Sequence, residues 1–373
     1  MTRQRYVTCL SAVAMFVMVC PFICASAAPQ SVTEETTPTY NLYFGDLHAH
    51  TSFSDGLGTP EDAYKQAREN DADFMATTDH NYILSAEDWL TTLAMAESCT
   101  EDGEFVAIAA FEYFIPGLGE INTFNVPIMD LGAWNPGYSG SRVNALPTYY
   151  ESVAERDGVG LWVHPTWAFS KEFDDFDYRT DTSDLAMGLL EVHNYGNWEY
   201  YKQLDDEPSY IMALDNGWHV MPAATSDTHA TNWITGYGAR TVLLAESLTR
   251  DHLYDAMAAG RGYATVDDNL RVDFKLNGAL MGSTLSGIDS TYVATIHIVD
   301  PDDVPSDFIT KVEILSDGGR VVDALDVNTA DVTWTVTIDD DQASYFYIRI
   351  STASNIDGNS GVTAWTAPVW TGR

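Results

Sequence analysis

Two histidines that stand one residue apart open the stretch of this sequence with the clearest chemistry. His48 and His50 follow an apolar run that ends at Leu47, and Asp55 comes shortly afterwards in a Ser-Asp-Gly turn. Because residues i and i+2 of an extended strand project to the same side, both imidazoles should leave the strand together. Nitrogen and oxygen donors that converge in this way suit Zn²⁺, Mn²⁺ or Fe²⁺. For this segment alone, the alternative is a polar loop with two surface histidines.

The same kinds of residue recur at the ends of later apolar runs. We expect strands at 42–47, 73–78, 105–111, 158–163, 185–192 and 219–225, each followed by His, Asp or Glu. Of the nine histidines in the chain, six lie at or near such a strand end, so chance placement is a poor explanation. The candidate metal ligands are His48, His50, Asp55, His80, Glu112, His164, His193, Asp227 and His229.

So many donors exceed the needs of one metal ion, and two or three divalent ions (Zn, Mn or Fe) fit them, with some ligands shared. Glu112 is the best bridge between ions because a carboxylate has two oxygens, and Asp227 is a second candidate. Two cations about 4 Å apart can ionise one water and clamp a substrate oxygen. The chemistry we expect is hydrolysis by a metal-bound hydroxide held by Glu112 and Asp227.

Helical patterns alternate with these strands. Helices are expected at about 60–70, 85–99, 146–156, 198–216 and 249–259, and further strands at 119–125 and 240–244. Thr59 as N-cap with Pro60 at the first helical position marks the first of these helices. The alternation indicates parallel βαβ units and an α/β fold, and in a β/α barrel the active site forms at the carboxyl ends of the strands.

After about Asp268 the pattern changes to strands without intervening helices. They are expected at 271–276, 292–298, 311–316, 332–338 and 345–351, which predicts a β-sandwich. We therefore divide the 373 residues into a signal peptide at 1–27, a linker at 28–39, a β/α metallohydrolase domain at 40–268 and an all-β sandwich at 269–373.

The N-terminus reads as a targeting segment. Arg3 and Arg5 precede an apolar run over about 6–23, and the small residues at 25–27 resemble a cleavage site. We expect a secreted or periplasmic protein with no stable membrane insertion after cleavage of this Sec-type signal peptide. Only Cys99 lies beyond the signal segment, which excludes an intrachain disulfide and a thiolate metal cluster in the mature chain.

The net charge of −37 argues against nucleic acid as a partner, because phosphates would be repelled. The hydrophobic content of 45% is that of a folded protein rather than a disordered acidic tail. The partner expected is a small-molecule substrate, and the sequence leaves the oligomeric state open.

Taken together and in order, the motifs resemble those of the PHP (polymerase and histidinol phosphatase) superfamily. They are His48-Ala49-His50 with Ser54-Asp55-Gly56, Thr78-Asp79-His80, Glu112 after an apolar strand, His164-Pro165, Glu191-Val192-His193-Asn194 and Asp227-Thr228-His229. The resemblance covers residues 42–245 and implies a distorted seven-stranded β/α (TIM-like) PHP barrel with a trinuclear metal centre. The export signal, the opening motif and the C-terminal β-domain are similar to the secreted carbaryl-hydrolase-like branch.

The resemblance also implies how the ligands are shared among three ions. The three sets are His48, His50, Glu112 and Asp227; Glu112, His164 and His193; and Asp55, His80 and His229. Asp55 stands where some relatives carry His, so the occupancy of the third set is less defined.

Other residues have competing interpretations. Asp79 either orients a liganding imidazole or makes a structural hydrogen bond. Arg240 either meets an anionic leaving group or forms a structural salt bridge. Aromatic residues beyond the strand ends either wall a substrate pocket or pack in loops, and they are Trp167, Tyr195, Trp198 and Trp233. Three histidines without matching partners are taken as structural or exposed: His219, His252 and His297.

The function expected from these observations is a secreted metal-dependent hydrolase, foremost a phosphoesterase of class EC 3.1. Few Lys or Arg residues follow the ligand-bearing strands, so no phosphate clamp is evident. A hydrolase of carbamates, amides or carboxylic esters therefore remains an alternative. A third reading is a non-catalytic, metal-stabilised binding protein whose β-sandwich contacts polysaccharide or envelope.

Overall fold

The computed structural model describes residues 39–126, 145–166, 172–195, 206–354 and 361–373. Within it, Thr39–Arg373 forms one compact unit. The predicted signal peptide and nearly all of the predicted linker lie outside the described residues.

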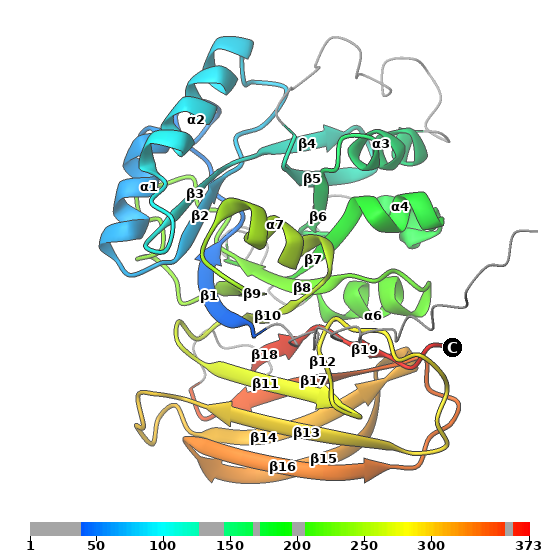
Figure 1. The fold of residues 1–373 in the computed structure, drawn as a ribbon. Helices are drawn as coiled ribbons and strands as arrows, with labels where there is room; N and C mark the ends of the chain where they lie inside the picture. The colour runs from blue at the N-terminus through cyan, green and yellow to red at the C-terminus, as the bar shows by residue number, and fades with distance from the viewer. Residues whose placement is uncertain (1–38, 127–144, 167–171, 196–205, 355–360) are drawn as a thin grey trace, which may run out of the picture. The chain divides into compact units, whose positions relative to one another are not determined.

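Three parallel strands form the first part of the structure, and two helices pack beside them (Figure 1). The strands are β1 (Asn41–Asp46), β2 (Phe74–Thr77) and β3 (Val106–Ala109), and the helices are α1 (Pro60–Glu69) and α2 (Ala86–Cys99). Thr59 and Ser85 each cap a helix through a capping box, with Asp62 and Asp88 as the reciprocal partners. The helices and the first two strands lie where the sequence pattern predicts them, whereas the strand predicted at 105–111 is divided between β3 and β4 (Phe111–Ile115).

A second sheet has the order β4-β5-β6-β7-β8. Its strands are β4 (Phe111–Ile115), β5 (Gly119–Phe124), β6 (Val159–Val163), β7 (Met187–Asn194) and β8 (Met221–Thr225). The helices of this part are α3 (Ala145–Ala154), η3 (Glu172–Phe176), α4 (Asp181–Ala186) and α6 (Glu207–Asp215). The β4–β5 and β5–β6 pairs are antiparallel, whereas β6, β7 and β8 run parallel.

The predicted closed seven-stranded barrel is not formed by the described strands. Instead, β1 pairs on one side with β9 (Arg240–Ala245), which runs antiparallel and continues through β10 (Gly262–Thr265) toward the C-terminal strands. β9 therefore occupies the edge of β1 that would pair with β8 in a closed barrel. β8 contacts β9 through the Thr241 hydroxyl, which donates to the Ala224 carbonyl at 3.0 Å. The fold is mixed α/β with open sheets, and α7 (Arg250–Ala258) follows β9.

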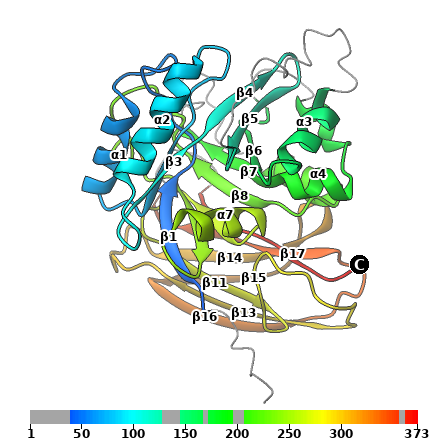
Figure 2. The same cartoon turned by 45° about the horizontal axis from the view of Figure 1, so that its top comes forward.

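Two isolated bridges nevertheless tie the strand ends of the two sheets together. Ala49 pairs with Thr228, and His80 pairs with Glu112, all just beyond or at the start of a strand. Figure 2 shows the β1–β3 and β4–β8 groups facing each other with α1 and α2 on one side and α3 and α4 on the other. The bridged residues include candidate ligands, so the open sheets still bring the predicted site together.

The C-terminal part is built from strands, as predicted, but it is not a separate sheet system. A four-stranded sheet contains β11 (Arg271–Leu276), β12 (Ala279–Leu280), β13 (Tyr292–Val299) and β16 (Asp331–Ile338). The ten-stranded sheet contains β14 (Ile309–Ser316), β15 (Arg320–Thr329), β17 (Tyr345–Thr352) and β18 (Val362–Thr366). A short helix, η4 (Asp317–Gly319), lies between β14 and β15, and β19 (Val369–Trp370) pairs with β17.

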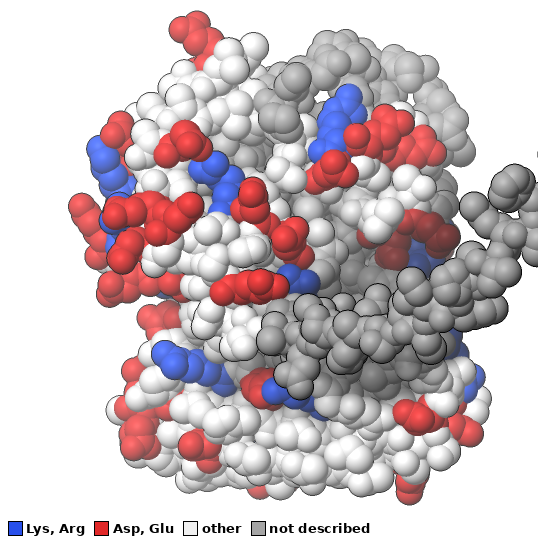
Figure 3. Space-filling view, in the orientation of Figure 1, with Lys and Arg blue, Asp and Glu red and all other residues white. Residues whose placement is uncertain are grey.

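Because β10 pairs with β18, the ten-stranded sheet contains strands from both sides of residue 268. The domain boundary at that residue stays a prediction. Alternate residues of β13 are buried, so apolar side chains such as Tyr292, Ile296 and Ile298 enter the core. On the surface, acidic side chains outnumber basic ones in the view of Figure 3, in line with the net charge of −37. No helix among the described residues is both long and apolar enough to cross a bilayer.

Candidate metal centre

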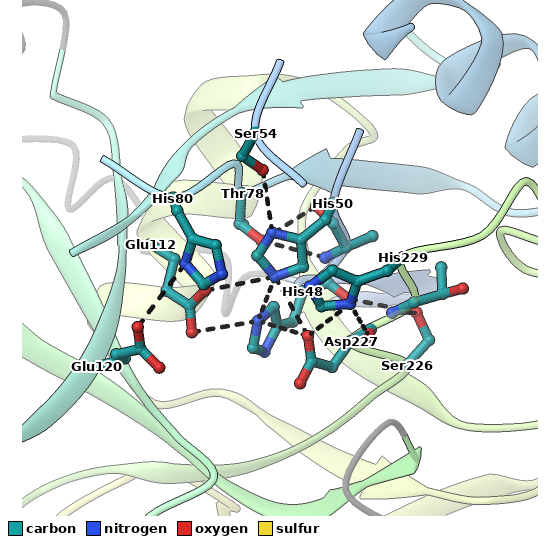
Figure 4. A network of polar contacts seen from close by, with 12 residues as sticks. His48, His50, Ser54, Thr78, His80, Glu112, Glu120, Ser226, Asp227 and His229 are labelled. Atoms are coloured by element: carbon teal, nitrogen blue, oxygen red, sulfur yellow. Dashed lines mark hydrogen bonds and ion pairs between the residues drawn. The ribbon is translucent and has the colours of Figure 1, made fainter. Parts of the chain in front are cut away.

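Four side chains from three strand ends meet at the core of the site: His48 and His50 after β1, Glu112 in β4 and Asp227 after β8 (Figure 4). His48 Nε2 lies 3.3 Å from His50 Nε2 and 3.3 Å from Asp227 Oδ1. His50 Nε2 lies 3.2 Å from the same Asp227 oxygen. Glu112 offers one oxygen to each imidazole, Oε1 at 3.5 Å from His48 and Oε2 at 3.3 Å from His50. These five separations define a compact cage of two nitrogens and carboxylate oxygens.

The cage has the dimensions of a metal site. Ligand atoms at about 2.0–2.1 Å from a tetrahedral ion lie about 3.3–3.4 Å from one another. The separations of 3.2–3.5 Å match that spacing, whereas ordinary hydrogen bonds between these groups would be shorter. His48, His50 and Glu112 are wholly buried, and two imidazoles with two carboxylates form a donor set that suits a divalent ion. The residues present therefore fit the metal that the sequence predicts.

Two of the ligands adopt backbone conformations that are unusual outside glycine. His164 has a φ of 31° and Asp227 a φ of 48°. Hydrogen bonds hold both: the His164 N–H donates to Glu191 at 2.6 Å, and the Asp227 N–H donates to the His48 carbonyl at 2.9 Å. Strain of this kind concentrates where a side chain must be aimed at a functional site.

A second group of donors adjoins the cage through Glu112. His164 Nε2 lies 3.1 Å from Glu112 Oε1 and 3.6 Å from Glu120 Oε2. His80 Nδ1 lies 2.8 Å from Glu112 Oε2 and 3.7 Å from Glu120 Oε1. Glu112 thus contacts two further histidines, His164 and His80, and stands where the sequence predicts the bridging carboxylate.

Glu120 was missed by the sequence analysis. It lies on β5, opposite Phe114 of β4, and is 5% exposed. Its one sequence signal is an acidic residue inside a segment that is otherwise buried, which no motif marks. Burial and the charge of Glu112 raise the pKa of Glu120 to about 7, so this carboxyl lies in a place that favours a nearby positive charge.

A third group lies at the outer side of the site. His229 Nε2 is 3.3 Å from Asp55 Oδ1, His80 Nε2 is 3.7 Å from Asp55 Oδ2, and His50 Nδ1 is 3.8 Å from Asp55 Oδ1. The hydrogen bond with His229 lowers the pKa of Asp55 to about 2 against the opposing effect of burial. Asp55 and His229 are half exposed, so this group is the most open to solvent.

His193 is the predicted ligand that joins none of the donor groups found among the described residues. It is buried, and burial lowers its pKa to about 4. Pairing between β7 and β8 is irregular between Glu191 and His193, which breaks the alternation of side chains expected along a strand. Glu120, rather than His193, forms a donor group with Glu112 and His80. Glu112 also belongs to a group with His48 and His164.

Glu191 belongs to one of the sequence motifs but is not among the predicted ligands. It contacts His48 at Nδ1, the ring nitrogen that does not face the cage. This wholly buried carboxylate accepts from His164 N–H at 2.6 Å, Thr225 Oγ1 at 2.6 Å and Asn194 Nδ2 at 2.9 Å. Its Oε1 lies 2.7 Å from His48 Nδ1. A carboxylate in this place keeps the proton on Nδ1 and leaves Nε2 free to bind a metal.

Asp79 makes structural hydrogen bonds, and only Ser54 connects it to a candidate ligand. It accepts from the Thr51 N–H at 2.8 Å, from the Thr51 hydroxyl at 2.7 Å and from Ser54 Oγ at 2.6 Å. Ser54 Oγ in turn lies 3.5 Å from His50 Nδ1. Asp79 therefore fixes the loop after β1, and Ser54 stands between it and the imidazole.

Of the predicted substrate-binding residues, Arg240 and Trp233 have structural contacts. Arg240 is buried and donates to the carbonyls of Ile234, Tyr237 and Ala239, so its described contacts hold the loop before β9. Trp233 is buried and donates its indole N–H to the His50 carbonyl at 3.2 Å.

The remaining aromatic predictions are less defined by the structure. The ring of Tyr195 lies against Tyr237 with centroids 3.6 Å apart, while Trp167 and Trp198 fall outside the described residues. None of the three histidines taken as structural or exposed joins the donor groups: His219 pairs with Asp184, His252 with Ser247 and His297 with Asp331.

The carboxylates give the site a strong preference for positive charge. Although burial alone would lower the pKa of each imidazole, Glu112 and neighbouring carboxylates raise the pKa of His80 to about 9 and that of His164 to about 10. The pKa of His48 rises well above its ordinary value, against the effect of burial, because of Asp227, Glu191 and Glu112. A divalent cation would satisfy the same field without protons on the ligands.

Exposed apolar side chains lie beside this centre. Tyr82 is 59% exposed and stacks on His80 with ring centroids 5.0 Å apart, and it makes an edge-type contact with Phe114 with centroids 5.8 Å apart. None of the described Lys and Arg side chains forms an ion pair with a candidate ligand.

Comparison with known proteins gives one family match. Residues 46–119 match the model of the PHP domain, a segment that holds His48, His50, Asp55, His80 and Glu112. No curated protein matches the chain.

Three solved structures are similar. One is a two-domain protein from Bacteroides vulgatus ATCC 8482 described as containing a predicted PHP-like metal-dependent phosphoesterase, with 16% identity, a TM-score of 0.48, and coverage of 89% of this chain and 97% of that chain. Another, from Bifidobacterium adolescentis ATCC 15703, is a proposed metal-dependent phosphoesterase, with 17% identity, a TM-score of 0.34, and coverage of 58% and 96%. The third is an amidohydrolase from Chromobacterium violaceum with bound sulfate and no metal, with 14% identity, a TM-score of 0.34, and coverage of 50% and 87%.

At these identities and TM-scores the function must be argued from the site itself, and the carbaryl-hydrolase-like branch stays a prediction. The match to the PHP-domain model over residues 46–119 coincides with the first five candidate ligands, and the described residues contain clusters of His, Asp and Glu that could hold divalent metal ions.

Proposed function

We propose that this protein is a metal-dependent hydrolase, and most specifically a phosphoesterase. The observation that carries the proposal is the cage, in which His48 Nε2, His50 Nε2 and Asp227 Oδ1 lie 3.2–3.3 Å from one another, the spacing of ligands around a tetrahedral metal ion. The two oxygens of Glu112 face the two imidazoles at 3.3–3.5 Å. Two further donor groups adjoin the cage, so two or three ions can be held side by side. Bound divalent cations would supply Lewis acidity that lowers the pKa of a water and stabilises charge on a substrate oxygen.

The residues of this chain have distinct tasks in such a reaction. Glu112 holds donors on both sides and keeps two cation positions close together. Glu191 fixes the tautomer and orientation of His48, and the Ser54–Asp79 pair does the same for the loop that carries His50. The buried part of the cage excludes bulk water, while the half-exposed Asp55 and His229 leave an open side for a substrate.

The phosphoester assignment rests on the PHP-domain match and on the multiple cation positions, which suit the clamping of two oxygens of a phosphoryl group. A second candidate, hydrolysis of an aryl carbamate or carboxylic ester, is favoured by the exposed ring of Tyr82 beside the cage. Such a ring can receive an aromatic leaving group.

Metal content and substrate panels test the proposal together. The purified chain should contain two or three Zn, Mn or Fe ions by mass spectrometry, and Asp227→Asn should contain fewer. Asp326→Asn is the matched control, because it makes the same charge change at an exposed position of β15. Phosphomonoesters, phosphodiesters and aryl carbamates should then be assayed with the metal-loaded protein. Turnover of carbamates without turnover of any phosphoester would select the second candidate.

We further propose that the protein is exported, as its N-terminal sequence indicates, and that it belongs to the secreted carbaryl-hydrolase-like branch. Sequencing the N-terminus of the mature chain tests the export proposal, which requires a start after about residue 27. The non-catalytic alternative makes a separate prediction: His50→Ala would leave every measured function of the protein unchanged.

A further inference from the structure

A second group of oxygen donors lies where two loops meet, and it shares no residue with the metal centre. β11 and β13 pair antiparallel, with Arg271 opposite Val299 at one end of the ladder. The chain before Arg271 and the chain after Val299 therefore leave the sheet side by side. The first carries Asp267, Asp268 and Asn269, and the second carries Asp300, Asp302 and Asp303.

Asp300 has a buried oxygen that no described residue satisfies. The residue is only 2% exposed. Its Oδ1 accepts from the Asp302 N–H at 3.0 Å, but its Oδ2 is buried and has no hydrogen-bond partner. A buried carboxylate oxygen without a partner costs free energy, so a cation or a hydrogen-bond donor such as water is expected beside it.

Asn269 presents a second unsatisfied oxygen on the neighbouring loop, and both Asn269 and Asp300 are hydrogen-bonded to Asp302. Its Nδ2 donates to Asp302 Oδ1 at 3.0 Å, which fixes the orientation of the amide. Its Oδ1 is then buried without a partner. The opposite orientation of the amide would place oxygen against the Asp302 carboxylate and leave a buried NH₂ group unsatisfied, so it offers no relief.

Asp267 brings another carboxylate to the group. It is 7% exposed, and its Oδ1 accepts from the N–H groups of Asn269 at 3.0 Å and Leu270 at 2.9 Å. Burial, and the nearby charge of Asp300, raise the pKa of Asp267 to about 6. No Lys or Arg among the described residues forms an ion pair with Asp267 or Asp300. Arg240 acts on Asp267 only through a longer-range electrostatic interaction, so no described side-chain cation lies in contact with either carboxylate.

We propose that Asp267, Asn269 and Asp300 bind a calcium ion that joins the loop after β10 to the loop after β13. Carboxylate and amide oxygens are the ligands that Ca²⁺ prefers, and it completes its shell of six to eight oxygens with water or backbone carbonyls. The absence of nitrogen and sulfur donors from this set disfavours zinc. Asp302 acts as a positioning residue because it holds the Asn269 amide by its nitrogen.

The ion would stabilise the connection between two sheets. β10 belongs to the ten-stranded sheet and β13 to the four-stranded one, so the loops that bind calcium link them. An ion that binds the folded state alone raises the unfolding temperature in a concentration-dependent way. Calcium is therefore a structural ligand here, and the hydrolytic activity is not expected to require it.

The test is thermal unfolding of the full, zinc-loaded protein with and without 2 mM CaCl₂, which is about 100-fold or more above the dissociation constant of a moderate site. Wild type should gain about 3 °C or more. Asp300→Asn and Asn269→Ala should gain less than about 1 °C, and the exposed-site control Asp326→Asn should gain as much as wild type.

Asp300→Asn gives a second signature that does not depend on loss of folding. Without calcium it should unfold at a higher temperature than wild type, because one of two repelling buried charges is gone; with calcium the order should reverse. No calcium-dependent gain in wild type, or an equal gain in Asp300→Asn, would overturn the proposal and leave a buried water as the occupant. Hydrolytic turnover measured in parallel distinguishes this result from failure of the proposed function, because the variants should keep it.

Discussion

Replacing Glu191 with Gln should disable the metal cage without touching a ligand. The carboxylate takes four donors: His48 Nδ1 and Thr225 Oγ1 at one oxygen, and His164 N–H and Asn194 Nδ2 at the other. Gln has one oxygen and one NH₂ group, so two of the four donors must face an N–H. If the NH₂ faces His48, the imidazole is driven to the tautomer that has its proton on Nε2, where the metal should bind.

The magnitude follows from these contacts. Hydrogen bonds to a charged group contribute about 1.5–3 kcal/mol each, so losing two of them in a wholly buried place should lower the free energy of unfolding by about 3–6 kcal/mol. Loss of a carboxylate behind a liganding imidazole lowers metal affinity by about 10–100-fold. The two effects are separable, because unfolding can be measured on metal-free protein and affinity on the folded protein.

The assay is competition for Zn²⁺ against a chromophoric chelator, together with urea unfolding of the metal-free protein. Glu155→Gln is the matched control, because Glu155 is exposed after α3 and makes the same change of charge. Wild-type zinc affinity in folded Glu191→Gln would refute the reasoning that Glu191 fixes the His48 tautomer. An unchanged free energy of unfolding would show that the four donors find other acceptors.

Three other predictions concern single residues. Glu120→Gln should retain the ion of the cage but bind one ion fewer than wild type, as counted by mass spectrometry; an unchanged count would remove Glu120 from the ligands. Trp233→Phe should lower the free energy of unfolding by about 1–2 kcal/mol, because the buried His50 carbonyl loses its donor, and urea titration measures this. The hydrogen bonds from His219 lower the pKa of Asp184 although burial opposes them. Because a lowered carboxyl pKa stabilises the fold above the unfolded value of about 3.8, Asp184→Asn should be less stable than wild type at pH 6, and the difference should shrink as the pH falls below 4.

Most elements of the fold could be predicted from local sequence. The capped helices α1 and α2 lie where Thr59 and Ser85 start them, and the early strands lie where apolar runs end in polar residues. The closed barrel was the main error: alternation of strands and helices does not reveal that β4, β5 and β9 pair antiparallel to their neighbours. Strand direction and pairing depend on contacts between residues far apart in the chain.

The sequence by itself determined the chemistry available: a set of His, Asp and Glu side chains placed at strand ends by local spacing, which favours divalent metal ions. Only the tertiary structure decided which of them meet. It added Glu120 through the antiparallel β4–β5 pair and placed Glu191 against His48 Nδ1. Where the β7–β8 register shifts, His193 joins none of the donor groups formed by the described residues. The physical reason is that residue type follows from the sequence alone, whereas convergence within a few ångströms depends on strand register, and one irregular step re-aims the side chains that follow it.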